Sequence, residues 1–352
     1  YGVGSVEGAE GMTTPAAIEL HGRLADFVDQ GAKHAAIEVS SQALSQGRVD
    51  GVRFDSALFT NLSRDHLDYH ENMSEYFASK ARLFLDCCPR NRIINLDSEY
   101  GDQLAAKCGQ DVVTVSTRFD RVANGRPHLF VRSIVATDHG SDIRFVSSWG
   151  DGRFTLPLPG EFNVANAVLV LALLLKKGVP LTTACDVMSQ VSAPPGRMQR
   201  VAMDGPAVFV DYAHTPAALE VALRALRAHC RGRLWVVFGC GGDRDSGKRP
   251  QMGKAAEHLA DHVVITNDNP RSEAPDAIVD DIVAGLTHPE RVTIIEDRAA
   301  AIAWTIEQAA DADVILVAGK GHEDYQETCG KRVPFSDYAI ARKALTVKEG
   351  AR

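Results

Sequence analysis

Three charged side chains in the second half of the chain suit the binding of a charged amino acid. Arg244, Arg271 and Glu323 each lie a few residues after a different apolar run of the kind that forms a buried strand. Two guanidinium groups and a carboxylate could together hold a ligand that carries two carboxylates and an amine. The alternative is that these charges are solvated loop tips.

The loop that carries Arg244 has the outline of a phosphate-binding loop. Gly242 to Lys248 matches G-x-x-x-x-G-K between a predicted strand and a predicted helix. The next residue is Arg249 rather than the Ser or Thr that would hold Mg²⁺. Three charged residues, Asp243, Arg244 and Asp245, occupy the loop interior, where a phosphate needs free backbone N–H groups. We therefore favour a loop that binds an anion or zwitterion. An ATP phosphate loop and a structural glycine turn are the alternatives.

Residue types that bind metals are concentrated in the first half. Asp65, His66, Asp68 and His70 fall within six positions after a predicted strand, and Glu38 lies at the end of another. Carboxylate and imidazole ligands in this mixture suit Mg²⁺ or Mn²⁺ better than zinc. Turn and helix-cap chemistry is the alternative explanation for the same residues.

Helix and strand patterns alternate in the first half, which is typical of a mainly parallel sheet. Helices are predicted over residues 15–30, 74–86 and 98–107, and strands over 35–39, 56–59, 92–95 and 112–115. Thr13 or Thr14 is the predicted N-cap of the first helix, and Ser74 that of the second. Alternating patterns over 128–137, 143–148 and 153–157 indicate a small antiparallel sheet. Apolar helices are predicted over 160–179 and 181–191.

A second α/β pattern follows the segment Ala193-Pro194-Pro195-Gly196, which is the best linker candidate because Pro and Gly stop helices. Strands are predicted over 207–210, 234–238, 262–266, 292–295 and 313–318, with helices near 216–229, 251–260, 276–285 and 298–310. This pattern predicts a Rossmann-like doubly wound domain, whose ligands lie beyond the carboxyl ends of the strands. At about 150 residues per domain, the length also favours two domains. We place them at residues 1–192 and 193–352.

Composition narrows the class of protein. The apolar fraction is 45%, the charged fraction 24% and the net charge −8, which excludes a disordered chain and offers no basic field for nucleic acid or anionic membrane. The longest purely apolar run, 167–175, is too short to span a bilayer. Seven scattered Cys without a C-x-x-C pair predict inert thiols in a reducing compartment, and so a cytoplasmic protein.

Taken in order, these clusters resemble the Mur ligase family, the ATP-dependent amide ligases of bacterial cell-wall precursor synthesis. The resemblance covers nearly the whole chain. Its motifs are weak singly and highly specific together: MTTP, EVSSQALSQGR, FTNLSRDHLDYH, SKARLF, GEFNVANA, PPGRM, DYAHTP, FGCGGDRDSGKRP, DNPR and GKGHEDYQ. It implies an α/β central ATPase domain with a small antiparallel β insert, followed by a Rossmann-like ligase domain that binds the incoming amino acid.

The resemblance also implies a role for individual residues. The UDP-muramoyl dipeptide is expected at Thr13, Thr14, Ser40, Gln46 and Arg48. Two Mg²⁺ ions are expected at Glu38, His66 and Lys80, with Lys80 carbamylated by CO₂. ATP is expected at Asn61, Asn166, Arg197, Asp211 and His214. The amino-acid pocket is expected at Arg244, Asp268, Asn269, Pro270, Arg271, Gly319 and Glu323.

The DNPR motif, Asp268 to Arg271, is the family's mark for meso-2,6-diaminopimelate rather than lysine. Arg271 can pair with the distal carboxylate that lysine lacks, and a site built for that charge loses the partner when lysine enters. The implied reaction joins diaminopimelate to the D-glutamyl side-chain carboxylate of UDP-N-acetylmuramoyl-L-alanyl-D-glutamate through an acyl phosphate. The expected partners are these small molecules and ATP, bound to a monomer.

One departure from the family pattern concerns the start of the chain. The family's central domain begins with a G-T-x-G-K-T loop upstream of MTTP, and no such motif precedes Met12, where relatives often have Asn. We therefore expect a chain truncated at its N-terminus, without the uridine-binding domain and inactive by itself. The alternatives are a fragment that only binds substrate and a sister ligase of the lysine-adding or folylpolyglutamate synthase type. A dinucleotide-dependent oxidoreductase would need G-x-G-x-x-G where DYAHTP stands.

Overall fold

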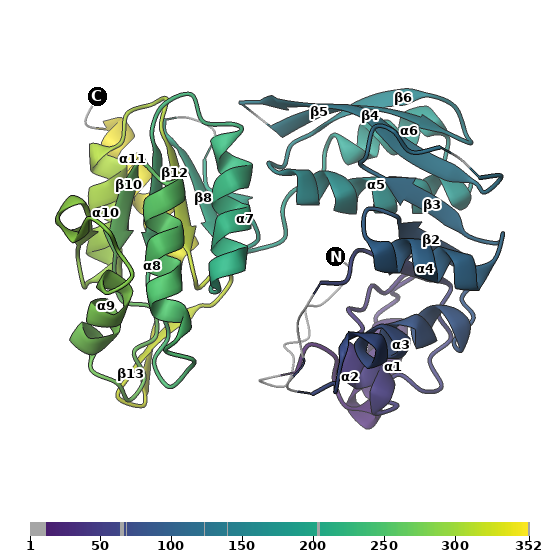
Figure 1. Cartoon of the computed structure of the whole chain (residues 1–352), viewed down its shortest axis with the longest axis horizontal. Coiled ribbons are helices and arrows are strands. Elements are labelled where there is room, and N and C mark those ends of the chain that lie inside the picture. The colour runs from purple at the N-terminus through teal and green to yellow at the C-terminus, as the bar shows by residue number, and fades with distance from the viewer. Residues whose placement is uncertain are drawn as a thin grey trace. The chain divides into compact units, whose positions relative to one another are not determined.

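The computed structural model describes residues 12–63, 67, 69–122, 124–138, 140–202 and 205–350, and the chain forms two compact units (Figure 1). The N-terminal unit comprises Tyr1–Ser133, Arg144–Arg153 and Ala165–Asp186, and the C-terminal unit comprises Ile134–Ile143, Phe154–Val164 and Val187–Arg352. The predicted domain boundary after residue 192 stays a prediction. Within the described ranges, no helix is both long and apolar enough to cross a membrane.

Six strands in sequential order make the first sheet: β1 (Ser56–Phe59), β2 (Asn91–Asn95), β3 (Val113–Ser116), β4 (His128–Thr137), β5 (Gly140–Ser147) and β6 (Gly152–Leu156). The pairs β1–β2, β2–β3 and β3–β4 are parallel. The turns after β4 and β5 are too short for a crossover, so the last three strands run antiparallel. The strands predicted over 56–59, 92–95, 112–115, 128–137, 143–148 and 153–157 are thus confirmed, but the last three extend the parallel sheet and do not form a sheet of their own.

The remaining elements of the first half are helices: α1 (Ala17–Asp29), α2 (Ser41–Ser45), α3 (Met73–Leu85), α4 (Glu99–Cys108), α5 (Glu161–Lys176) and α6 (Leu181–Met188). Two predicted N-caps are wrong. The cap of α1 is Ala16, and that of α3 is Asn72, whose side chain accepts a hydrogen bond from the Glu75 amide at 3.0 Å. A cap must stand one residue before the first helical position, and Ser74 is already inside α3.

The strand predicted over residues 35–39 is also wrong, because these residues belong to no strand and most of them are exposed. A strand needs a partner whose backbone completes the ladder. Here a side chain makes the connection instead: the Thr14 hydroxyl donates to the Glu38 carbonyl at 2.8 Å and accepts from the Ser40 amide at 3.0 Å.

The second sheet has the order β11-β10-β9-β12-β8-β7, and every pair is parallel except β7–β8. Its strands are β7 (Gln199–Arg200), β8 (Ala207–Asp211), β9 (Leu234–Phe238), β10 (His262–Ile265), β11 (Thr293–Ile294) and β12 (Val314–Ala318). All five predicted strands are confirmed. The connection from β11 to β12 crosses to the other side of β9, which is the switch in strand order that places ligands at the carboxyl edge of such sheets.

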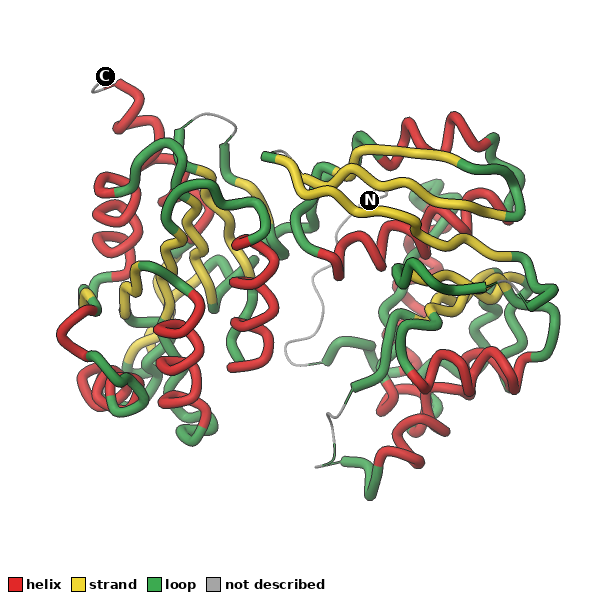
Figure 2. Tube along the Cα trace, turned by 45° about the horizontal axis from the view of Figure 1, so that its top comes forward, coloured by secondary structure: helices red, strands yellow, loops and turns green. Residues whose placement is uncertain are grey.

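Helices cover both faces of this second sheet (Figures 1 and 2). Helices α7 (Pro216–Arg227), α8 (Lys248–Leu259) and α9 (Pro275–Val283) pack on one face, and α10 (Arg298–Gln308) and α11 (Asp337–Gly350) pack on the other. Along β12, Val314 and Leu316 join the first core, while Ile315 and Val317 join the second. Burial on both faces explains the unbroken apolar runs in the sequence.

Helix α11, the 3₁₀ turn Pro289–Arg291 and a hairpin of β13 (Tyr325–Thr328) with β14 (Lys331–Pro334) were not predicted from the sequence. The side chains of β14 are all exposed, so no alternation of apolar and polar residues marks the hairpin.

The glycine that ends the predicted linker is packed into the C-terminal unit. Gly196 is buried with φ 65°, and a Cβ there would overlap the backbone of Gly321 and His322. We expect Gly196→Ala to lower the free energy of unfolding by about 2–4 kcal/mol, because it adds steric overlap with immobile backbone to the strain of a positive φ.

The matched control for this prediction is Gly330→Ala, since Gly330 has φ 72° and nothing within 4 Å of an added Cβ. That change should cost only about 1 kcal/mol, the backbone strain alone. Urea unfolding of the two variants measures the difference, and equal losses would show that the close approach at Gly196 is unimportant.

Candidate active site in two units

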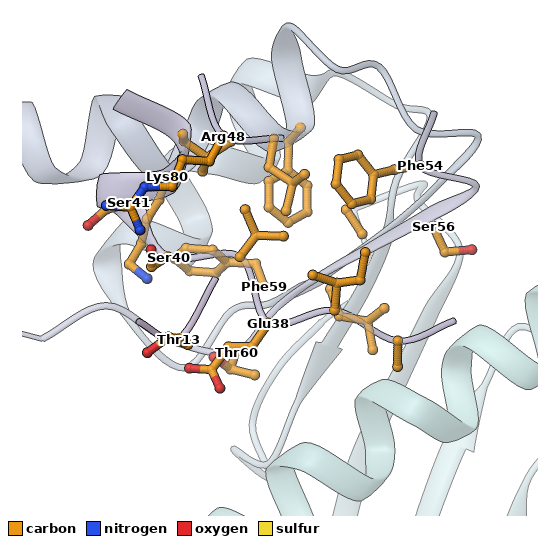
Figure 3. A pocket seen from close by; sticks show the side chains of 18 of the residues that line it. Thr13, Glu38, Ser40, Ser41, Arg48, Phe54, Ser56, Phe59, Thr60 and Lys80 are labelled. Atoms are coloured by element: carbon orange, nitrogen blue, oxygen red, sulfur yellow. The ribbon is translucent and has the colours of Figure 1, made fainter. Parts of the chain in front are cut away.

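The N-terminal unit contains a pocket of about 810 Å³ (Figure 3). Residues 35–42 form one wall, β1 and the residues after it form a second, and α3 contributes Lys80, Leu83 and Phe84. Thr13, Glu38 and Thr60 lie together at one edge, whereas Phe54 lies at the opposite end from Ser41. The pocket therefore combines a polar region, suited to charged ligands, with an aromatic wall.

Hydrogen bonds between distant segments build the polar region. Arg48 donates to the Thr14 carbonyl at 3.1 Å and to Gln46 Oε1 at 2.8 Å, and Gln46 donates to the Tyr69 hydroxyl at 3.0 Å. Ser40 caps α2, with its hydroxyl accepting from the Ala43 amide at 3.1 Å. These bonds bring together the residues expected to hold the dipeptide. Thr13, Ser40 and Arg48 line the pocket itself, while Thr14 is fully buried and holds the wall.

Two of the three residues expected at the metal site, Glu38 and Lys80, line this pocket. Lys80 stands one turn after Tyr76 on α3, with its Nζ 5.3 Å from the centre of that ring. The third, His66, lies outside the described residues, as do Asp65 and Asp68. Among the residues that are described, no three His, Cys, Asp or Glu side chains gather closely enough to hold a metal ion.

The residues expected to contact ATP are divided between the two units. Asn61 lines the pocket, and Asn166 is exposed on α5. The others lie at the carboxyl end of β8 and before β7 in the C-terminal unit: Arg197, Asp211 and His214.

Arg197 packs its guanidinium 4.8 Å from the centre of the Tyr212 ring, and His214 Nδ1 lies 2.7 Å from the Tyr212 carbonyl. The Asp211 carboxylate accepts from the amides of Met198 and Ala213 at 2.7 and 2.8 Å. Burial raises the pKa of Asp211, and these two amide hydrogen bonds oppose that shift. Asp211 therefore holds the turn that carries Arg197.

Three loops converge at the carboxyl ends of β9, β10 and β12. The Gly242 amide donates to the Asn269 carbonyl at 2.9 Å, and Asn269 Nδ2 donates to Glu323 Oε2 at 2.9 Å. Pro270 lies between, and a Cβ on Gly242 would overlap its carbonyl. The structure thus brings the predicted amino-acid residues of these loops into one cluster, with Arg244 exposed at its rim.

The backbone of Arg271 is held in the left-handed region at φ 53°. Its amide donates to the Glu327 carbonyl at 3.1 Å, its carbonyl accepts from the Cys329 amide at 2.6 Å, and its Nη1 donates to the Gly242 carbonyl at 2.8 Å. A non-glycine residue adopts this conformation only when its surroundings impose it. The unpredicted hairpin therefore helps to aim the guanidinium.

Asp268 and Gly319 have supporting positions in this cluster. Asp268 is buried, which raises the pKa of its carboxyl, and the cations of Arg298 and Lys320 oppose that shift. A Cβ on Gly319 would overlap Asp268 Oδ2, and Gly319 has φ 118°. Only glycine leaves room for this carboxyl.

The loop of residues 242–248 is not arranged as a phosphate cradle. Glu273 Oε1 already accepts from the Asp243 amide at 2.5 Å, and Asp245 Oδ1 accepts from the Gly247 amide at 2.9 Å. Lys248, which would reach a phosphate, donates instead to the His214 carbonyl at 2.8 Å. Carboxylates thus occupy the amides that an ATP phosphate would need.

Lys320 is the residue of this cluster that sequence reasoning missed. It is fully buried, and its Nζ donates to Asn269 Oδ1 at 2.9 Å and to Glu323 Oε2 at 2.8 Å. The sequence offers one signal: a lysine two residues after an apolar strand, between two glycines, is poorly placed to extend into solvent.

The thiol of Cys240, which follows β9, should be inert. It is 3% exposed, and burial raises its pKa to about 12, so at pH 8 almost none of it is the reactive thiolate. We expect iodoacetamide to modify the exposed Cys329 within minutes while native Cys240 stays unmodified, as measured by peptide mass spectrometry. Labelling of both at similar rates in the folded protein would contradict the burial of Cys240.

Comparison with known proteins matches both halves of the chain to one family. A model for the Mur ligase middle domain matches residues 1–174, and one for the Mur ligase glutamate ligase domain matches residues 196–321. UDP-N-acetylmuramoyl-L-alanyl-D-glutamate–2,6-diaminopimelate ligases from two strains of Haemophilus influenzae are 47% identical over 332 residues, which is 94% of this chain and 67% of theirs.

Solved structures agree with this assignment. A structure of UDP-N-acetylmuramoyl-L-alanyl-D-glutamate–2,6-diaminopimelate ligase superposes with a TM-score of 0.70 and 38% identity, covering 95% of this chain and 69% of that one. Folylpolyglutamate synthase from Mycobacterium tuberculosis shares the fold, with a TM-score of 0.62 and 20% identity over 92% of this chain and 70% of that one. The chain belongs to the Mur ligase family, and so to a family of ATP-dependent ligases.

Proposed function

We propose that this protein adds meso-2,6-diaminopimelate to the D-glutamyl side-chain carboxylate of UDP-N-acetylmuramoyl-L-alanyl-D-glutamate, with ATP as the energy source. The observation that carries the proposal is the pairing, through Asn269, of the Glu323 carboxylate with the loop that aims Arg271. A cation and an anion held in one hydrogen-bonded cluster suit the zwitterionic end of diaminopimelate. The names of the 47% identical relatives support the same substrate.

The N-terminal pocket suits Mg²⁺ because the side chains that line it offer oxygen atoms as ligands. Glu38 supplies a carboxylate, and Thr13 and Ser40 supply hydroxyls, all oxygen donors of the kind that Mg²⁺ prefers. We propose that Glu38, His66 and Lys80 hold two Mg²⁺ ions, with Lys80 carrying a carbamate made from its amine and CO₂. The carbamate would turn a cation into a second carboxylate in this pocket. When bound, the ions offset negative charge during phosphoryl transfer.

The chain's own residues then have three tasks, which are to hold the dipeptide, to contact ATP and to orient diaminopimelate. Thr13, Ser40 and Arg48, with Thr14 and Gln46 behind them, hold the dipeptide so that its side-chain carboxylate accepts the γ-phosphate of ATP, which leaves ADP. Asn61, Asn166, Arg197, Asp211 and His214 are proposed to contact ATP.

The amino-acid cluster completes the reaction. Arg271 and Glu323, with Arg244, Asp268, Asn269, Pro270 and Gly319 around them, orient diaminopimelate. Its neutral amine attacks the acyl carbon of the acyl phosphate, and a C–N bond forms. The C–O bond breaks, and the inorganic phosphate that leaves takes up the proton that the nitrogen gives up. We propose a division into a central domain at 1–192 and a ligase domain at 193–352, acting as a monomer in the cytoplasm.

An ADP-release assay with matched amino acids, run on a chain that includes the family's G-T-x-G-K-T loop, tests this function. We expect ADP and the UDP-linked tripeptide to form with meso-diaminopimelate and not with L-lysine. ADP release with a folate and glutamate instead would favour the folylpolyglutamate synthase type. Calorimetric binding of diaminopimelate without any ADP release would favour a chain that only binds substrate.

A further inference from the structure

A buried lysine beside the amino-acid pocket has no role in the reaction proposed above. The side chain of Lys320 is 0% exposed, whereas that of its ion-pair partner Glu323 is 18% exposed. Burying an ammonium group is costly unless its donors and its charge are met by partners. Asn269 Oδ1 and Glu323 Oε2 accept from two of the three N–H donors at 2.9 and 2.8 Å, Glu323 balances the charge, and the Tyr325 ring lies 5.4 Å from the ammonium.

The orientation of the Asn269 amide follows from its neighbours. Its oxygen accepts from both Lys320 Nζ and the Glu327 amide, each at 2.9 Å, and both of these groups can only donate. The Asn269 nitrogen must therefore point the other way, where it donates to Glu323 Oε2 at 2.9 Å. Asn269 is 1% exposed, so these bonds are shielded from water.

Both donors, from Lys320 and Asn269, converge on the same oxygen of Glu323. The Glu323 amide also donates to the Lys320 carbonyl at 3.0 Å, which fixes the backbone of the turn. Within the part of the chain that the structure describes, no hydrogen bond is formed to the other oxygen, Oε1. One oxygen of this carboxylate is thus saturated, and the other is left to accept a ligand.

We propose that Lys320 is a positioning residue, which together with Asn269 holds Glu323 Oε2 so that Oε1 accepts from the distal ammonium group of diaminopimelate, the one that does not react. This inference rests on the proposed function, which supplies the amino acid. A carboxylate with both oxygens mobile would lose rotamer freedom on binding, and the tether from Lys320 removes that cost beforehand. The buried ion pair of Lys320 and Glu323 thus favours substrate binding because it fixes the Glu323 carboxylate before the ligand arrives.

A double-mutant cycle between Lys320 and Glu323 tests the inference in the full chain. We expect Lys320→Met to lower kcat/KM for diaminopimelate by about tenfold or more, mainly through a higher KM, with the KM for ATP unchanged. In a Glu323→Gln background, which removes the charged acceptor, the same change should cost less than about twofold. Lys331→Met, at an exposed position on β14, is the matched control.

The outcomes separate this inference from the proposed function. A wild-type protein that does not use diaminopimelate would refute the function. Equal losses from Lys320→Met in both backgrounds, or a kcat/KM that is unchanged, would overturn the positioning role alone. If Lys320→Met does not fold, as judged by thermal unfolding, Lys320→Gln replaces it in the same cycle. Its amide keeps N–H donors but not the charge, so a smaller loss that again vanishes in the Glu323→Gln background is expected.

Discussion

Replacement of Arg271 by lysine should lower kcat/KM for diaminopimelate by about 10²–10³-fold. One nitrogen of the guanidinium donates to the Gly242 carbonyl at 2.8 Å, and the other nitrogens can donate to a carboxylate of the ligand. A lysine ammonium at the end of a flexible chain cannot form both sets of hydrogen bonds in this fixed geometry. Lysine meets the same backbone strain at φ 53° as arginine does, so the loss should come from the side chain. Steady-state kinetics with diaminopimelate and with L-lysine measure it.

The control for this change is Arg291→Lys, in the exposed 3₁₀ turn before β11. It should leave kinetics with both amino acids unchanged. The KM for ATP should also stay the same in Arg271→Lys, because the substitution alters only the amino-acid pocket. Unchanged diaminopimelate kinetics in Arg271→Lys would refute the assignment of Arg271 to the distal carboxylate.

Replacement of Lys80 by alanine should lower kcat by about 10²–10³-fold, because the N-terminal pocket would lose one of its two proposed carboxylates for Mg²⁺. Glu38 would then be the one described carboxylate of the pocket proposed to hold metal. A short carboxylic acid such as acetate or propionate should restore part of the rate, since it can diffuse into the space that the side chain vacates. The assay is ADP release with and without the added acid.

The control here is Lys107→Ala, at the exposed end of α4, which should keep full activity. Carbon NMR after exposure to ¹³CO₂ gives a second measurement, and a carbamate signal should appear in the wild type and be missing in Lys80→Ala. Full activity of Lys80→Ala without any added acid or bicarbonate would contradict the carbamate role.

Strands buried on both faces can be predicted from the sequence, whereas strands that depend on a partner segment cannot. The apolar runs that became β8, β9, β10 and β12 were evident in the sequence because strands buried on both faces need apolar side chains throughout. Residues 35–39 have a similar composition and form no strand, because strand formation also depends on a partner backbone, which a single segment does not encode. The hairpin β13–β14 was missed because its exposed side chains leave no pattern.

For the candidate site too, the sequence predicts some features and only tertiary contacts determine the others. The sequence by itself determined which chemistry was available: guanidinium groups, carboxylates and glycines at the ends of strands, in an order that resembles one family. The tertiary structure decided how they act. Arg271 takes a left-handed backbone where the hairpin of β13 and β14 bonds to both its amide and its carbonyl. Lys320 is buried only because Asn269 and Glu323, 51 residues before it and three after, meet its charge. Hydrogen bonds between residues so far apart arise from packing, and local sequence preferences do not reveal them.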